Sequence, residues 1–326
     1  MRRLSLCLGV TALAALVCVA SATAAGGPTF TLYGGTGVAS HDGTLHYVTV
    51  PDSARATLLE TIGPAVGGVG SWIRLEGSWG IPAVGPVGAG LSRDGRTLVL
   101  ASNAGPYAAR STFLVIRLPR MKIRERVAIP GSFSFDALSP DGSRLYLIQY
   151  VAGQAGDFSD YIVRAYDVRR QKLLPGKIVD RKDDEKTMAG SPVTRAATAD
   201  GRWVYTLYLK PSGEPFVHAL DTVTATAHCI DLPSPPAREG FPKATLSLRD
   251  HGRTLAVGRD GRPWRDIAIG TWRVSPPPRT GSVFPWALAG AGIGAGLALL
   301  AAGALLLRRR RSKKVEQQAG QELRLA

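Results

Sequence analysis

The sequence predicts an all-β domain made of repeated four-stranded units, and three observations lead to this prediction. Residues 138–150 combine an apolar start, a Pro-Asp-Gly turn and an alternating strand-like run. This phrase occurs five times, with turn glycines Gly43, Gly95, Gly142, Gly201 and Gly252 at spacings of 52, 47, 59 and 51 residues. Between the copies lie short β-type runs, with no long amphipathic helix from residue 26 to 275. Strand-rich units at this interval are typical of the four-stranded blades of a β-propeller.

The best copy of the phrase is Ser139-Pro-Asp-Gly-Ser-Arg-Leu-Tyr-Leu147. It resembles the repeat of YVTN-type and WD-like β-propeller proteins, whose blades carry Ser-Pro-Asp-Gly-x-x-Leu-Tyr-Val. The resemblance covers most of residues 29–275 at one phrase per blade. It implies about five blades, or six or seven if a degenerate unit lies within residues 63–90 or 176–192. The alternative is a β-sandwich or a pair of them, and neither fold fixes a function.

Residues 1–25 are expected to be a secretory signal peptide, which leaves residues 26–275 as the propeller. Arg2 and Arg3 precede the apolar stretch 4–20, and Ala22-Thr-Ala24 fits a small-x-small cleavage site. Cleavage of this peptide places the propeller outside the cytoplasm.

The two ends of the propeller are expected to meet. Only three strands are recognisable in the last unit, residues 243–275, and Thr29–Tyr33 is an isolated strand-like run at the start. We expect this run to be the outer strand of the last blade, because such closure removes exposed sheet edges.

Two stretches that interrupt the repeat are expected to be loops. Residues 63–90 are rich in Gly, Pro and Val, and residues 180–186 form a mixed-charge run. Asp183, Asp184 and Glu185 in that run are expected to be solvated rather than to bind a cation. Three loop tryptophans are candidates for exposed contacts: Trp72, Trp79 and Trp264.

The C-terminal part is predicted to anchor the domain in a membrane. A Pro-rich linker, residues 276–283, precedes a predicted transmembrane helix at 284–307, which includes 22 residues without a charge. Residues 308–326 form a basic tail that begins with Arg308, Arg309, Arg310 and Arg311. The positive-inside rule puts this tail in the cytoplasm and the propeller outside, as a single-pass protein of the cell membrane.

A short motif before the apolar span gives an alternative location. Pro277-Pro-Arg-Thr-Gly281 resembles the Leu-Pro-x-Thr-Gly sorting signal of Gram-positive cell walls, which is also followed by an apolar span and a basic tail. Pro278, Thr280 and Gly281 match that pattern, and Pro277 departs from it. The resemblance implies a bacterial chain attached to the cell wall, as the alternative to a retained membrane anchor.

The predicted membrane helix also carries a stripe of small residues. Gly290, Gly292, Gly294 and Gly296 form two overlapping small-x-x-x-small pairs. Such pairs allow two helix backbones to approach closely, so a homodimer through this helix is one hypothesis. A glycine-rich anchor with no partner is the other.

The charge of the chain suggests what kind of partner the domain would meet. The formal net charge is +15, of which +5 lies in the tail and +8 in the extracytoplasmic part, with 31 basic and 23 acidic residues. This excess favours an anionic envelope polymer, lipid head groups or an envelope protein. No nucleic-acid-binding motif is visible.

No catalytic or metal-binding motif stands out, and no cofactor is predicted. The histidines, His41, His46, His218, His228 and His251, include no close metal-type pair, and no nucleophile elbow or phosphate loop is present. Cys7 and Cys18 belong to the signal peptide, so Cys229 cannot form an intramolecular disulfide and is expected to be a small buried residue. The aromatic residues in predicted strands, Tyr146, Tyr150, Tyr166, Trp203, Tyr205 and Tyr208, are expected to pack between blades.

These observations favour an envelope-anchored, non-enzymatic propeller that acts as a binding or scaffold module. The alternative is a membrane-tethered enzyme of lactonase or lyase type. A cluster of His, acidic and Arg side chains at one mouth of the channel would favour the enzyme. A channel filled by Val, Ala and Gly would favour the binding module.

Overall fold

The computed structural model describes residues 30–32, 37–53, 55–63, 68–84, 87–102, 109–151, 160–182, 187–234 and 243–278. Several predictions concern residues outside these ranges: the signal peptide, the membrane helix with its glycine stripe, the arginine tail, Thr280 and Gly281 of the sorting motif, and the acidic residues 183–185. Within the ranges that the structure describes, no helix has the length and apolar character needed to cross a membrane.

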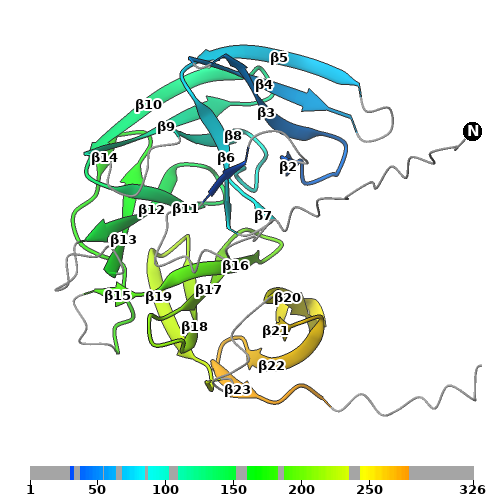
Figure 1. Cartoon of the computed structure of the whole chain (residues 1–326), viewed down its shortest axis with the longest axis vertical. Helices are drawn as coiled ribbons and strands as arrows, with labels where there is room; N and C mark the ends of the chain where they lie inside the picture. Colours follow the sequence, from blue (N-terminus) through cyan, green and yellow to red (C-terminus); the bar gives the residue numbers. More distant parts are fainter. Residues whose placement is uncertain are drawn as a thin grey trace, which may run out of the picture. The chain divides into compact units, whose positions relative to one another are not determined.

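Five antiparallel sheets follow one another along the chain (Figure 1). The first sheet contains β2 (Val38–Ala39), β3 (His46–Ser53), β4 (Ala56–Ile62) and β5 (Val69–Glu76). The second contains β6 (Trp79–Val84), β8 (Thr97–Ser102), β9 (Arg110–Arg117) and β10 (Lys122–Pro130), while β1 (Phe30–Leu32) and β7 (Val87–Gly88) both pair with β6. The third contains β11 (Phe133–Leu138), β12 (Arg144–Val151), β13 (Asp160–Asp167) and β14 (Lys172–Leu173), with β15 (Met188–Ala189) paired to β13.

The last two sheets have four strands each. They contain β16 (Ser191–Ala197), β17 (Trp203–Leu209), β18 (Pro215–Asp221) and β19 (Thr226–Asp231), and then β20 (Thr245–Arg249), β21 (Thr254–Arg259), β22 (Arg262–Ala268) and β23 (Arg273–Ser275). The short 3-10 turn η1 (Asp250–Gly252) is the one helical element in the part of the chain that the structure describes. The predicted all-β class is confirmed, and each sheet holds one copy of the repeated phrase.

The phrase forms the turn before β3, β8, β12, β17 and β21, one strand in each sheet, and its chemistry explains why it recurs. In the first copy the Ser40 hydroxyl donates a hydrogen bond to Asp42 and accepts one from the Leu45 N–H, while Asp42 also accepts the Thr44 N–H. Hydrogen bonds from Ser40 and Thr44 lower the pKa of Asp42 to about 2. All five turn glycines have positive φ, from 65° to 83°, a conformation that glycine adopts without a steric penalty.

Among the described residues, the core consists of four apolar clusters, each formed by two consecutive sheets. One cluster joins the first and second sheets, and the next three join the second to the third, the third to the fourth and the fourth to the fifth. The second, third and fourth sheets therefore bury both faces, whereas the strands of a simple β-sandwich bury one. Among the strand aromatics, Tyr146, Tyr150, Tyr166, Tyr205 and Tyr208 are buried in these clusters. Consecutive packing of four-stranded sheets is the organisation of a propeller-type repeat.

The prediction that the N-terminal run completes the last sheet was wrong. β1 instead pairs with β6, with Phe30 opposite Ala83 and Leu32 opposite Ile81. The last sheet supplies its own four strands, because residues 266–274 contain a turn. Gly270 and Trp272 have positive φ there and separate β22 from β23.

The prediction that residues 63–90 form a loop was also wrong. This stretch contains β5, β6 and β7, which complete the first sheet and begin the second. The strands were not recognised because the stretch is rich in glycine and proline, which usually indicate loops. Gly77, with a φ of 102°, marks the short turn between β5 and β6, and Pro82 lies within β6. No additional repeat is needed to account for these residues.

Candidate functional site

A pocket of about 450 Å³ lies between the first strands of the first, third and fourth sheets and residues 87–91 of the second sheet. Its walls come from β2, from residues 87–91, from β11 and from β16, together with residues of the repeated turns. Most of the lining side chains are Val, Ala, Gly and Leu. His41 and Arg93, both from repeated turns, also line it and are exposed. The pocket is thus mainly apolar, with basic side chains on the turns that line it.

Two buried charged residues stand out in this apolar lining. Arg195 Nη2 donates to Asp136 Oδ1 at 2.6 Å, and the side chains are only 6% and 1% exposed. Arg195 Nε also donates to Thr206 Oγ1 at 3.1 Å. Two atoms of the pair, Asp136 Oδ2 and Arg195 Nη1, are buried and have no hydrogen-bond partner among the described residues. The pair therefore has one spare acceptor and one spare donor.

Local backbone geometry accounts for the position of Asp136. The pairing of β11 with β12 shifts between Phe135 and Ala137, so Asp136 is the extra residue of a β-bulge. A bulge leaves its extra residue outside the regular pairing and redirects the side chain. Asp136 is thereby directed to Arg195 of β16, in the next sheet along the chain. Sequence reasoning missed this pair, although a charged residue in the otherwise apolar run 133–138 was a usable signal.

The histidines noted in the sequence lie in different surroundings. His41 Nε2 lies 2.9 Å from the carbonyl oxygen of Ser92. His228 stacks near Trp203 and Trp272, at ring-centroid distances of 6.1 and 5.0 Å. His218 is buried in β18, whereas His251 is exposed in η1. No group of three or more His, Cys, Asp or Glu side chains in the described ranges is arranged to hold a metal ion.

The three tryptophans proposed as exposed contacts differ from one another. Trp72, in β5, is 59% exposed. Trp79 is 2% exposed, because it lies in β6 rather than in a loop, and its Nε1 donates to the carbonyl oxygen of Glu76 at 2.7 Å. The exposed-contact prediction is therefore wrong for Trp79. Trp264, in β22, is partly buried, with the Arg265 guanidinium 4.7 Å from its ring centroid.

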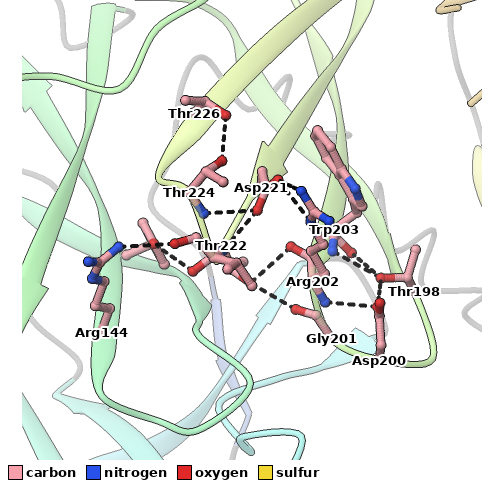
Figure 2. Close-up of polar contacts among 12 residues, drawn as sticks. Arg144, Thr198, Asp200, Gly201, Arg202, Trp203, Asp221, Thr222, Thr224 and Thr226 are labelled. Carbon is pink, nitrogen blue, oxygen red and sulfur yellow. Dashed lines mark hydrogen bonds and ion pairs between the residues drawn. The ribbon is translucent and has the colours of Figure 1, made fainter. Parts of the chain in front are cut away.

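A second polar cluster lies at the turn between β18 and β19 and holds the third and fourth sheets together (Figure 2). Asp221 accepts hydrogen bonds from Arg202 Nη2 at 2.8 Å and from two N–H groups of the turn. The Tyr146 hydroxyl, from β12, donates to the carbonyl oxygen of Thr222 at 2.8 Å. Arg144 Nη1, also from β12, donates to the carbonyl oxygen of Val223 at 3.2 Å. These contacts bind two sheets together, and the cluster has a structural role.

Asp221 should make the domain acid-sensitive. Burial alone would raise the pKa of Asp221, but the hydrogen bonds from Arg202 and the turn N–H groups lower it. A carboxylate with a lowered folded pKa stabilises the fold above its unfolded pKa of about 4, and this stability is lost as the pH falls through the folded value. We expect Asp221→Asn to lower stability at pH 7 by about 1–2 kcal/mol, with a smaller difference below pH 4.

Thermal unfolding of the two proteins across pH tests this expectation. Asp231→Asn is the matched control, because Asp231 is 78% exposed in its contact with Lys210 and exposed pairs contribute little. If the wild type were more stable than Asp221→Asn by the same amount at pH 7 and at pH 3, the ionised Asp221 carboxylate would not be the source of the stability.

No family model matches the chain, and no curated protein matches it. Among solved structures, it is similar to TolB from Acinetobacter baumannii, with 13% identity over 78% of this chain and 55% of that chain, and a TM-score of 0.43. It is similar to the Cps50 (Swd1) β-propeller domain of Myceliophteria thermophila, with 15% identity over 79% and 68% of the two chains and a TM-score of 0.43. It is also similar to the periplasmic gluconolactonase PpgL of Pseudomonas aeruginosa, with 17% identity over 76% and 70% and a TM-score of 0.42. The chain thus spans about half of the TolB chain.

Proposed function

We propose that this chain is a non-enzymatic binding module of the cell envelope whose ligand enters the pocket between the first strands. The observation that carries this proposal is the lining: small apolar walls around one buried Asp136–Arg195 pair. Ligand pockets are commonly apolar with a few fixed polar groups that orient the ligand. The envelope location comes from the predicted signal peptide, membrane helix and basic tail.

The buried pair suggests the chemistry of the group that enters. The two charges neutralise one another, while Asp136 Oδ2 can accept and Arg195 Nη1 can donate one further hydrogen bond. A neutral group with an adjacent donor and acceptor, such as an amide, fits both atoms, and unpaired buried polar atoms gain most from such a partner. Outside the buried pair, His41 and Arg93 are basic, as is the extracytoplasmic part as a whole. A partner with an apolar, amide-bearing group next to anionic groups meets both requirements.

Blocking the pocket tests the proposal. Ala197 lines the pocket and is exposed in β16, so Ala197→Trp should obstruct the pocket without entering the core. Ala128→Trp is the matched control, because Ala128 is an exposed alanine of β10 that does not line the pocket. We expect the immobilised full chain in detergent to retain a component of fractionated envelope protein or polymer, and Ala197→Trp to weaken its binding at least tenfold.

Two outcomes would overturn the proposal. Equal retention by the wild type and both variants would place binding elsewhere on the surface. Hydrolysis of δ-gluconolactone by the wild type, lost in Ala197→Trp and kept in Ala128→Trp, would instead assign the pocket to the lactonase class. Melting curves of all three proteins show whether each variant is folded.

A further inference from the structure

Three soft or borderline metal-ligating side chains meet between the third and fourth sheets, in the core cluster that these sheets share. Cys229 Sγ lies 3.9 Å from Met188 Sδ and 3.9 Å from His218 Nδ1. His218 and Cys229 are directly opposite one another in β18 and β19, which places their side chains on one face of the sheet. Met188 comes from β15, which belongs to the third sheet.

The two distances suit a shared metal ion. A metal bound at about 2.0–2.1 Å from nitrogen and about 2.3 Å from sulfur has its ligand atoms roughly 3.6–4.0 Å apart at tetrahedral to trigonal angles. The Sγ–Sδ separation falls in this interval, and the Sγ–Nδ1 separation is about 0.1 Å longer than one sulfur and one nitrogen ligand require. Cys229 is thus placed to share a metal with either neighbour.

The surroundings hold the imidazole in a fixed, buried position. His218 is 1% exposed. The ring meets Tyr208 edge to face at a centroid distance of 6.3 Å. His218 Nε2 is buried and has no hydrogen-bond partner among the residues that the structure describes. Nδ1 is the ring nitrogen on the Cys229 side and the ligand atom of the proposed site.

A carboxylate next to the site is already engaged. Asp180 Oδ2 accepts the backbone N–H of Cys229 at 2.9 Å, and Asp180 Oδ1 accepts the N–H of Lys182 at 3.0 Å. These bonds fix the backbone that carries the thiol and leave the ligand set as one thiol, one thioether and one imidazole. Cys229 is only partly buried, in contrast to the buried Met188 and His218, so an ion can approach from its side.

We propose that Met188, His218 and Cys229 form a binding site for a monovalent copper ion. Thiolate and thioether sulfur are soft ligands that select Cu(I), and imidazole also suits copper. Zn²⁺ is bound in proteins by Cys, His, Asp and Glu rather than by Met. The proposal does not depend on the pocket, which lies at the first strands of the sheets, whereas β19 is the last strand of its sheet.

Copper titration of the full chain tests the site. Cys7→Ser and Cys18→Ser form the background, so that the two cysteines of the predicted signal peptide cannot bind the probe. Under anaerobic conditions, Cu(I) is supplied from a chromophoric Cu(I) chelator, and we expect transfer of one equivalent to the protein with a rise in its melting temperature. Met188→Leu, His218→Gln and Cys229→Ser should each weaken Cu(I) binding at least tenfold, since even residues behind a ligand contribute about 10–100-fold.

Matched variants separate this site from incidental binding. Met121 is a buried methionine of a different core cluster, and His228 directly precedes Cys229, so its side chain points to the opposite face of β19. Met121→Leu and His228→Gln should therefore bind Cu(I) as the background protein does. Met188→Leu changes volume little and should stay folded, which keeps the test valid if another variant unfolds. Unchanged Cu(I) affinity in folded Met188→Leu, or tighter binding of Zn²⁺ than of Cu(I), would overturn the proposal.

Discussion

Replacing Asp136 with alanine is expected to destabilise the domain by about 3–5 kcal/mol, because it leaves a buried guanidinium without its partner. Arg195 is 6% exposed, and its ion pair with Asp136 measures 2.6 Å. Thr206 would remain as a hydrogen-bond partner of Arg195 Nε, but a hydroxyl cannot offset a full charge. Thermal or urea unfolding of the full chain measures the loss.

A double variant shows whether the unpaired charge is the cause. Asp136→Leu combined with Arg195→Met removes both charges with apolar side chains, and such replacements are often neutral. We expect the double variant to recover most of the stability. Arg195→Met alone should be destabilised, because the carboxylate of Asp136 is then buried without its partner. Equal destabilisation of the double and single variants would indicate lost packing instead.

The second large effect is expected for Gly142→Val, which should lower the free energy of unfolding by about 2–4 kcal/mol. Gly142 has a φ of 65°, which costs other residues about 1 kcal/mol or more. A Cβ at this position would lie 2.5 Å from Thr97 Oγ1 and 2.6 Å from Thr97 Cβ, in the neighbouring sheet. Thr97 is itself buried, so it cannot easily move, and overpacking of this kind costs about 1–3 kcal/mol.

Another copy of the same turn provides the control for Gly142. Gly95 has a φ of 68°, but a Cβ there would meet nothing within 4 Å. Gly95→Val should therefore show the backbone penalty alone, and Gly142→Val should melt at a clearly lower temperature. Combining Gly142→Val with Thr97→Ala should recover only part of the steric cost, because alanine removes Oγ1 and Cγ2 of Thr97 but keeps the Cβ. Equal melting temperatures of the two single variants would contradict the contact with Thr97.

The features that sequence reasoning predicted best are those with local causes. The Ser-x-Asp-Gly turn depends on hydrogen bonds between residues two to five positions apart, such as those of Ser40 and Asp42, so the four copies that keep Ser or Thr and Asp are visible in the sequence. The all-β class and the five sheets follow from these turns. Strands in residues 63–90 were missed because Gly and Pro usually indicate loops.

The candidate sites depend on contacts between distant parts of the chain. Asp136 and Arg195 are 59 residues apart, and Met188 and Cys229 are 41 residues apart. Neither pair lies in a motif with a fixed spacing. The position of Asp136 further depends on a bulge, which shifts the side chain out of simple alternation. Only the packing of consecutive sheets brings such residues together.

The division of the core into four clusters, one for each pair of consecutive sheets, makes the domain resemble a linear array with nearest-neighbour coupling. A sheet in the interior of such an array cannot open without breaking two interfaces. In these clusters, the first sheet packs against the second, and the fifth sheet packs against the fourth, so each has one apolar interface. Partial opening should therefore start at the ends of the array and proceed inward. Met188 belongs to the third sheet, and His218 and Cys229 belong to the fourth, so separation of these two sheets would divide the proposed copper ligands between them.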